Sequence, residues 1–313
     1  MNSDGKFIGS IIKQFRTSHN ITLASLADGI CTKDHLCSVE HDRSQPSFYL
    51  LDQLSKRLNV NLYEYYNTIM LFESIEAYSL SNEIFKYISN YELIELKYFI
   101  NRHETNEIFQ KGEPRKNLLY GKAVVENEFG NYQESLDICL NILSSENIDF
   151  HEASLDIKLY NHVELLILNL TAINYHCLNR FDEALHIYDI IHIQLSHILS
   201  HETYELYQNL YFETKLFLNV SSNLALLKIT NEKFIEAEKI INIALDTAQK
   251  MKLIHCHCEL LFGKCTIFYY TNRIEQAKSL LKEIEIFSKY EHKEKLYNDF
   301  IQQAKSIHPK LFE

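Results

Sequence analysis

Hydrophobic residues recur at helical spacing along the whole chain, and the first 69 residues divide into five short amphipathic segments. The first segment, 6–18, gathers large apolar side chains on one face: Phe7, Ile8, Ile11, Ile12 and Phe15. The fourth segment carries Leu50, Leu51, Leu54 and Leu58, and the fifth is NVNLYEYY at 59–66. Because polar turns separate the segments, this part of the chain is predicted to form five helices.

The second and third segments form a pair with clear start signals. Thr22 and Thr32 each precede an apolar helical pattern, and a threonine hydroxyl caps a helix by accepting a hydrogen bond from its first turn. Asp28-Gly29 ends the second helix. In the third helix, 33–41, Leu36 and Val39 are expected to face inward, and the outer face holds Lys33, Asp34, His35, Ser38 and His41. Two short helices joined by a turn with glycine match the geometry of a helix-turn-helix.

Further along, four segments share one pattern: FGNYQESLDICLNIL, LNRFDEALHIYDIIH, NEKFIEAEKIINIAL and TNRIEQAKSLLKEIE. Small residues occupy an anchor column, which consists of Ser135, Ala184, Ala237 and Ala277. They also occupy the column twelve positions earlier: Ala123, Ala172, Ala225 and Cys265. Three positions before the anchors stand Tyr132, Phe181, Phe234 and Ile274. Small side chains on both sides of a turn let paired helices pack closely, so these columns predict tetratricopeptide-like repeats.

The repeats depart from the standard length. Successive anchors are 49, 53 and 40 residues apart, compared with about 34 in the standard repeat, which predicts lengthened helices or inserted turns. One more degenerate helix pair is expected at 71–112, with NYELIEL as its turn. The charged stretch that follows Ile284 is expected to form a capping helix.

Composition and charge support this division. Seven Gly and three Pro in 313 residues are far fewer than the turns of a β-protein require. Residues 1–69 carry seven basic and seven acidic side chains, and the other 244 carry 24 and 35, so the whole net charge of −11 lies in the second part. We therefore expect an all-α protein with a helix-turn-helix domain at 1–69 and a right-handed TPR-like repeat domain at 70–313.

The chain is expected to be cytoplasmic. No apolar run approaches the ~20 residues that span a bilayer, and MNSDGKFIGS lacks the features of a secretion signal. The seven cysteines are odd in number, and most fall at positions that a helix would bury. Reduced core thiols explain them better than disulfides do.

The stretch ITLASLADGICTKDHLCSVEHDRSQPS at 21–47 resembles the Xre/Cro-type helix-turn-helix, in the form found in peptide-responsive regulators of Gram-positive bacteria. The residues on or near that pattern are Gly29, Ile30, Cys31, Leu36, Ser38, Glu40, Pro46 and Ser47. Two positions depart from it: Cys37 replaces the usual serine, and His41-Asp42 replaces the glycine after the glutamate. With the repeats, the resemblance extends to the RRNPP class over nearly the whole chain.

The resemblance implies roles for particular residues of the head. In the Xre family an arginine late in the first helix pairs with a glutamate at the end of the recognition helix, and Arg16 and Glu40 stand at those places. We expect them to form a bidentate clamp that fixes the third helix. If that helix enters the major groove, Lys33, His35 and Ser38 can reach bases, while Thr32, Arg43 and Ser44 can hold phosphates. The alternative for Arg16 and Glu40 is that they are two unrelated surface charges. The alternative for the polar residues of the third helix is that they form a solvated face that contacts no DNA.

The repeats are expected to bind a short peptide on their concave face. Nine residues are predicted to point inward from the first helix of each pair: Asn117, Tyr120, Asn127, Asn169, Asn219, Asn223, Phe262, Thr266 and Tyr269. A carboxamide both donates and accepts hydrogen bonds, so recurring asparagines can hold a peptide backbone. The alternative is chance, because asparagine is common throughout this chain.

Other chemistry finds little support in the sequence. His255-Cys256-His257-Cys258 would point to different faces of a helix, which argues against zinc. His197 and His201 lack the glutamate of a zincin motif. No cofactor, metal or catalytic residue is expected, and the protein is not expected to be an enzyme.

The resemblance implies a homodimeric quorum-sensing regulator that binds double-stranded promoter DNA and is controlled by a short signalling peptide, with no membrane partner. Two alternatives remain open. The repeats could bind a protein partner instead of a peptide, or the chain could be an interaction scaffold with a vestigial head. A peptide-regulated phosphatase-type switch is disfavoured by the helix-turn-helix.

Overall fold

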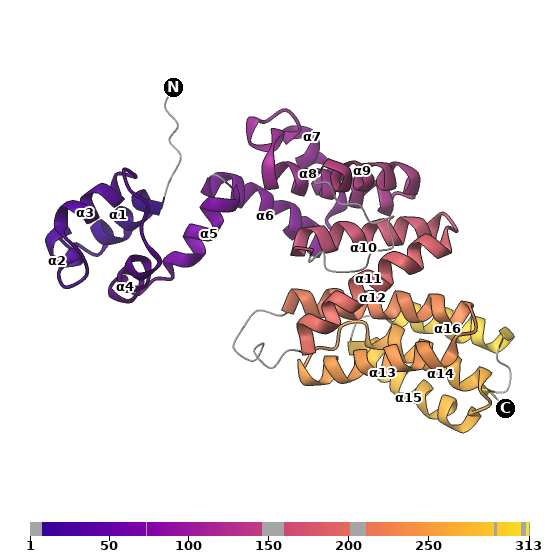
Figure 1. Cartoon of the computed structure of the whole chain (residues 1–313). Helices are drawn as coiled ribbons and strands as arrows, with labels where there is room; N and C mark the ends of the chain where they lie inside the picture. The colour runs from indigo at the N-terminus through magenta and orange to yellow at the C-terminus, as the bar shows by residue number, and fades with distance from the viewer. Residues whose placement is uncertain are drawn as a thin grey trace. The chain divides into compact units, whose positions relative to one another are not determined.

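The computed structural model describes residues 8–72, 74–145, 160–200, 211–290, 293–307 and 311–312. Within these ranges all regular structure is helical (Figure 1). The chain divides into two compact units, Met1–Phe129 and Gly130–Glu313. The all-helical fold predicted from the sequence is therefore confirmed, with short helices at the N-terminus and long antiparallel helix pairs behind them.

The five predicted helices of the head are all present. They are α1 (Ile8–Ser18), α2 (Leu23–Ala27), α3 (Lys33–Glu40), α4 (Phe48–Leu58) and α5 (Leu62–Phe72). Their apolar faces meet in one core, in which Ile12, Leu26 and Leu36 are completely buried. Phe7, which was expected on the same face as Ile8, lies outside the described residues. The domain boundary predicted at 69/70 falls inside α5, and it stays a prediction.

Side-chain caps set the starts of the middle helices, as the sequence predicts. The Thr22 hydroxyl accepts the Ser25 N–H at 3.1 Å, and the Thr32 hydroxyl accepts the His35 N–H at 3.2 Å. Each bond satisfies a backbone donor that the helix itself leaves unpaired. The lengths of α2 and α3 are therefore encoded locally.

The rest of the first unit contains the expected degenerate helix pair. Its elements are α6 (Ile75–Ser89), α7 (Leu93–His103), a 3-10 helix η1 (Glu107–Gln110) and α8 (Gly112–Glu128). Large residues, Ile84 and Leu96, replace the small pair of the other repeats and are fully buried. A Cβ atom at Gly121 would lie 2.8 Å from Ile84 Cγ2, so glycine on α8 makes room for them.

The second unit consists of longer helices. They are α9 (Tyr132–Ser145), α10 (His162–Cys177), α11 (Phe181–Ser200), α12 (Tyr211–Thr230), α13 (Phe234–Lys250), α14 (His257–Tyr270), α15 (Ile274–Tyr290) and α16 (Glu294–Ile307). Helices α11 and α12 have 20 residues each, which confirms the lengthening inferred from the repeat spacing. The predicted capping helix is α16, and it begins later than expected because α15 continues to Tyr290.

The residues of the repeat columns are buried. The anchors Ser135, Ala184, Ala237 and Ala277 are all 0% exposed. Their partners twelve residues earlier are at most 2% exposed. In the last pair, the Cys265 thiol lies 3.6 Å from the carbonyl oxygen of Ala277. A small side chain is thus what lets one helix approach the backbone of the next.

The turns of the repeats are also alike. Tyr132, Phe181, Phe234 and Ile274, which were aligned as one column, are the first residues of α9, α11, α13 and α15. Two positions before each of them the backbone is left-handed, with φ between 57° and 83°, at Gly130, Asn179, Glu232 and Asn272. Glycine and asparagine favour this conformation, so the turn explains three of the four residues.

One buried histidine links the stability of the second unit to pH. His192 on α11 stacks on Phe217 of α12, with ring centroids 5.1 Å apart and planes 27° apart. Its Nε2 is buried and has no hydrogen-bond partner among the described residues. Burial, helped by the positive charge of Lys228, lowers the pKa of His192 to about 4. The imidazole is therefore neutral in the folded protein.

We expect the second unit to lose stability as pH falls from about 6.5 towards 4, because the unfolded chain protonates His192 first. This residue contributes up to about 3 kcal/mol to that loss. Urea unfolding at several pH values should give a flatter profile for His192→Gln. The exposed His197→Gln serves as control, and an equally flat profile for both variants would contradict the prediction.

Candidate functional site

The outer face of α3 is the first candidate site. Thr32, Lys33, His35 and Arg43 are exposed, and Ser38 is half-buried. Ser44 is half-buried as well, and its hydroxyl oxygen is shielded from solvent without a hydrogen-bond partner in the described part of the chain. The polar residues predicted to contact DNA therefore lie on α3 and the turn after it, although their role stays a prediction.

A bidentate ion pair holds α3 against α1, as predicted. Arg16 Nε lies 2.6 Å from Glu40 Oε1, and Arg16 Nη2 lies 2.8 Å from Glu40 Oε2. The hydrogen bond with Glu40 raises the pKa of Arg16. The Glu40 side chain is only 1% exposed. Removal of Arg16 would therefore leave the Glu40 carboxylate buried without a counter-ion. Arg16 also donates to the Ile21 carbonyl at 3.0 Å, which ties in the segment before α2.

A second tie between α1 and the end of α3 was missed by the sequence analysis. The Gly9 N–H donates to Asp42 Oδ1 at 2.9 Å, so a carboxylate 33 residues away caps the first turn of α1. Burial raises the pKa of Asp42, and the hydrogen bond from Gly9 opposes that rise. A Cβ atom at position 9 would lie 1.9 Å from the Val39 carbonyl oxygen. Only glycine permits this approach of the two helices.

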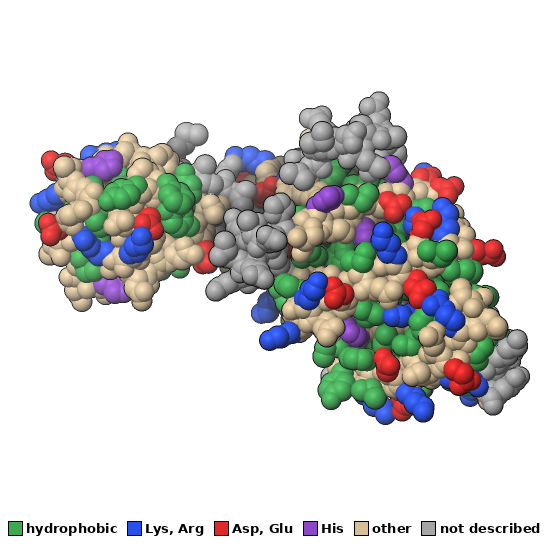
Figure 2. Space-filling view, turned by 60° about the horizontal axis from the view of Figure 1, so that its bottom comes forward, with side chains coloured by type: hydrophobic (Ala, Val, Ile, Leu, Met, Phe, Trp, Pro, Cys, Tyr) green, Lys and Arg blue, Asp and Glu red, His purple; other side chains and the backbone are tan. Residues whose placement is uncertain are grey.

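The charge of the molecular surface is mixed. Figure 2 shows one face on which basic and acidic side chains alternate over the second unit without forming a large field of one sign. The head also shows both basic and acidic side chains on this face. A broad basic surface, of the kind that binds nucleic acid without sequence preference, is not seen there.

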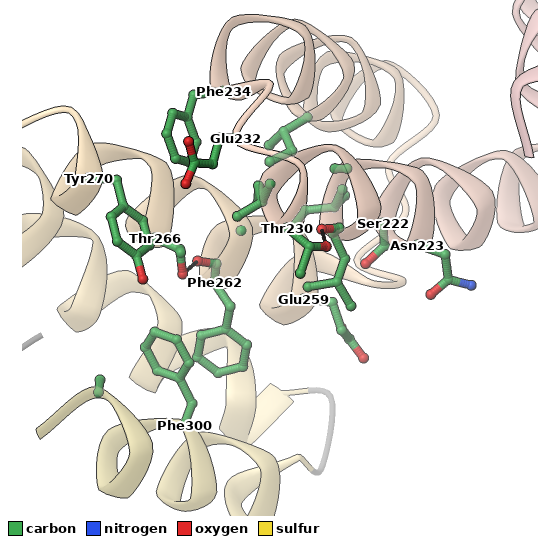
Figure 3. Close-up of a pocket in the computed structure, with 17 residues that line it drawn as sticks. Ser222, Asn223, Thr230, Glu232, Phe234, Glu259, Phe262, Thr266, Tyr270 and Phe300 are labelled. Carbon is green, nitrogen blue, oxygen red and sulfur yellow. Dashed lines mark hydrogen bonds between the residues drawn. The ribbon is translucent and has the colours of Figure 1, made fainter. Parts of the chain in front are cut away.

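The second candidate site is a cavity of about 720 Å³ in the second unit. It lies among α12, α13, α14 and α16 (Figure 3). Ala225, Leu226, Ile229 and Leu260 form much of its apolar wall. Two stacked aromatic pairs add to it: Phe262 with Phe300 at 4.2 Å, and Phe234 with Tyr270 at 5.6 Å. The few polar groups are Ser222, Asn223, Thr230, Glu232, Glu259 and Thr266.

Three of the nine predicted ligand residues line this cavity: Asn223, Phe262 and Thr266. Tyr269 does not line it, and its neighbour Tyr270 does. In the first unit, Asn117 and Tyr120 are 1% and 7% exposed, and Asn127 is half-buried. Asn169 is half-buried in the second unit. The structure thus gathers part of the predicted set, and the ligand role of all nine residues stays a prediction.

Asn219 has a structural partner instead. Its Oδ1 accepts the Cys256 thiol at 2.8 Å and lies 3.1 Å from His255 Nε2. These two residues precede α14, which begins at His257, and Cys256 has a left-handed backbone with φ of 56°. The four residues 255–258 therefore do not lie on one continuous helix, contrary to the assumption made from the sequence.

Metal and thiol chemistry find no site in the described residues. No three His, Cys, Asp or Glu side chains among them gather to hold an ion. His201, which was paired with His197 in the sequence, lies outside the described residues. None of the seven cysteines forms a disulfide, and burial raises the pKa of Cys139 and Cys265 to about 12. In the described part of the chain, no helix combines the length and apolar character that crossing a bilayer requires.

The fold is similar to that of solved transcriptional regulators. PlcR of Bacillus thuringiensis, in complex with the peptide PapR7 and DNA, matches with a TM-score of 0.74 and 14% identity, over 95% of this chain and 99% of PlcR. ComR of S. thermophilus, in complex with DNA and its signalling peptide ComS, matches with a TM-score of 0.58, 16% identity and coverage of 96% and 99%. The SHP pheromone receptor Rgg2 of Streptococcus dysgalactiae matches with a TM-score of 0.53 and 13% identity, over 96% of this chain and 99% of Rgg2. No family model and no curated protein sequence matches the chain.

We expect Arg16→Ala to destabilise the head by about 3 kcal/mol, because it leaves the Glu40 carboxylate buried without a partner. Replacing both residues in Arg16→Met/Glu40→Met should cost less, since neither charge remains. Urea unfolding followed by circular dichroism measures both. A double variant as unstable as Arg16→Ala would show that the cost comes from lost packing and not from the unpaired charge.

Proposed function

We propose that this chain is a homodimeric transcriptional regulator that binds promoter DNA through α3 and is controlled by a short signalling peptide bound to its repeat helices. One combination carries the proposal. The chain holds a helix-turn-helix with an exposed polar face, and its repeat helices hold a mostly apolar cavity. PlcR and ComR, whose fold it shares, were solved with DNA and signalling peptides.

The geometry of the head fits sequence-specific binding. The N-terminal residues of a recognition helix contact base edges, and Lys33 and His35 occupy that end of α3. Because the head is electrically neutral, non-specific attraction to phosphates supplies little affinity. Two heads joined in a dimer would gain affinity and selectivity from the spacing of two half-sites.

The cavity has the size and lining of a ligand site. Its volume of about 720 Å³ lies within the ~300–1,000 Å³ typical of ligand sites, which combine apolar walls with a few oriented polar groups. A peptide bound there would act on DNA affinity only through a difference between its affinities for two arrangements of the dimer. We also infer a cytoplasmic location, because a protein that binds promoter DNA acts where that DNA is.

A protein partner is the second candidate, and one observation favours it. Helix α7 and the residues before it expose Tyr91, Ile94 and Tyr98 by 79%, 62% and 73%. Ile94 and Tyr98 are four positions apart on α7, and Tyr91 lies in the turn before it; large exposed side chains that form one patch are the type of surface that binds another protein. A pull-down with the unaltered protein that recovers another protein in stoichiometric amount would support this candidate, provided that the Ile94→Asp/Tyr98→Asp variant no longer recovers it.

We expect Lys33→Ala/His35→Ala to weaken DNA binding at least tenfold, since a side chain that contacts a base edge contributes about 1–3 kcal/mol. The DNA probe is the set of genomic fragments that the unaltered protein selects, and fluorescence anisotropy measures its affinity. Lys250→Ala, which removes a positive charge from α13, is the control. Unchanged affinity of the double variant would favour a scaffold with a vestigial head.

We expect Thr266→Phe to fill the cavity and abolish the response of DNA binding to peptide, while DNA binding without peptide persists. Thr247→Phe is a matched control, because Thr247 donates to the Ile243 carbonyl as Thr266 donates to that of Phe262, but it lies outside the cavity. Isothermal titration with peptides encoded beside the gene measures binding. A normal peptide response in Thr266→Phe would contradict the assignment of the cavity.

A further inference from the structure

The cavity of the second unit is acidic. Its 17 lining residues include two carboxylates, Glu232 and Glu259, and no lysine, arginine or histidine. Glu259 is half-buried, and Glu232 is exposed at the edge of the cavity. The balance of these two carboxylates therefore decides which charges a ligand can bring into the cavity.

Glu259 is compensated within the protein. Its Oε1 lies 2.5 Å from Lys293 Nζ. It also belongs to the first turn of α14, where the partial positive charge of a helix N-terminus favours an anion. Its negative charge is thus already balanced, and the ligand does not need to balance it.

Glu232 has the opposite surroundings. It forms no ion pair with any residue that the structure describes. It lies in the turn between α12, which ends at Thr230, and α13, which begins at Phe234, so the partial charges of the two helix ends oppose each other there. Figure 3 shows it on the same side of the cavity as Phe234 and Tyr270.

The backbone of Glu232 is also unfavourable for its residue type. It is left-handed, with φ of 57°, at the turn position that Gly130, Asn179 and Asn272 occupy in three other helix pairs and Tyr91 occupies before α7. Glutamate has neither the freedom of glycine nor the short polar side chain of asparagine that this region favours. Of the two carboxylates at this cavity, Glu232 is the one without a counter-ion in the described part of the chain.

We propose that Glu232 pairs with a positively charged group of the ligand and makes the cavity selective for a peptide that carries a cation next to an apolar side chain. The stacked rings of Phe234 and Tyr270, with planes 16° apart, offer an aromatic surface to the same cation. The apolar side chain enters between the walls formed by Ile229, Leu260 and Phe262. This inference rests on the proposed function of the cavity.

The test uses pools of N-acetylated apolar heptapeptides that differ in one fixed residue, Lys, Gln or Glu. A fourth pool has Gln and a free amino terminus. Equilibrium dialysis against the full-length protein measures binding at low and high salt. We expect the Lys pool to bind about fivefold more tightly than the acetylated Gln pool, with a smaller difference at high salt. If the fourth pool also binds about fivefold more tightly than the acetylated Gln pool, the amino terminus of the peptide can supply the cation.

Glu232→Asn separates this role from a structural one. It should abolish the preference for the Lys pool and raise the melting temperature, because asparagine suits the turn and removes the charge. Glu275→Gln, at a side chain 89% exposed on α15 and outside the cavity, should change neither. Equal binding of the Lys, Gln and Glu pools would overturn the inference but leave the peptide site intact. Failure of every pool to bind would overturn both.

Discussion

The close approach of paired helices at small residues is the constraint on which the repeat body depends. Ala184, Ala237 and Ala277 have no exposed surface, and the residues twelve positions before them are equally enclosed. A larger side chain at any of these positions would force the helices apart or off their rotamers. The larger residues beside the small ones can fill the grooves between paired helices only because the small residues let the two backbones come close together. The cavity among α12, α13, α14 and α16 inherits its shape from that spacing.

Local and periodic signals explain why much of the fold could be predicted. Thr22 and Thr32 cap the helices that follow them, and the burial of the small columns follows from their period of twelve across a turn. Arg16 and Glu40 were found through a family pattern and not through local geometry. Elements of this kind are encoded within a few residues, so a single sequence suffices to place them.

The rest depends on contacts between segments that are far apart in the chain. No residue next to Gly9 in the sequence indicates that Asp42 accepts its N–H. The sequence likewise does not distinguish Asn219 from the other asparagines that were expected to point inward, although it contacts His255 and Cys256. The cavity was only half foreseen for the same reason. Phe300 and Ala304 reach it from the capping helix, whose position no repeat column defines.

The two ties between α1 and the region of α3 have a consequence for how the head can be regulated. The Arg16–Glu40 pair holds one side of the contact, and the Gly9–Asp42 bond holds the other, at a crossing too close for any side chain. Helix α3 therefore cannot slide or rotate relative to α1 without breaking both contacts. If the head binds DNA as proposed, its internal shape stays fixed, and a signal from elsewhere in the protein can alter only the distance and angle at which α3 meets the DNA.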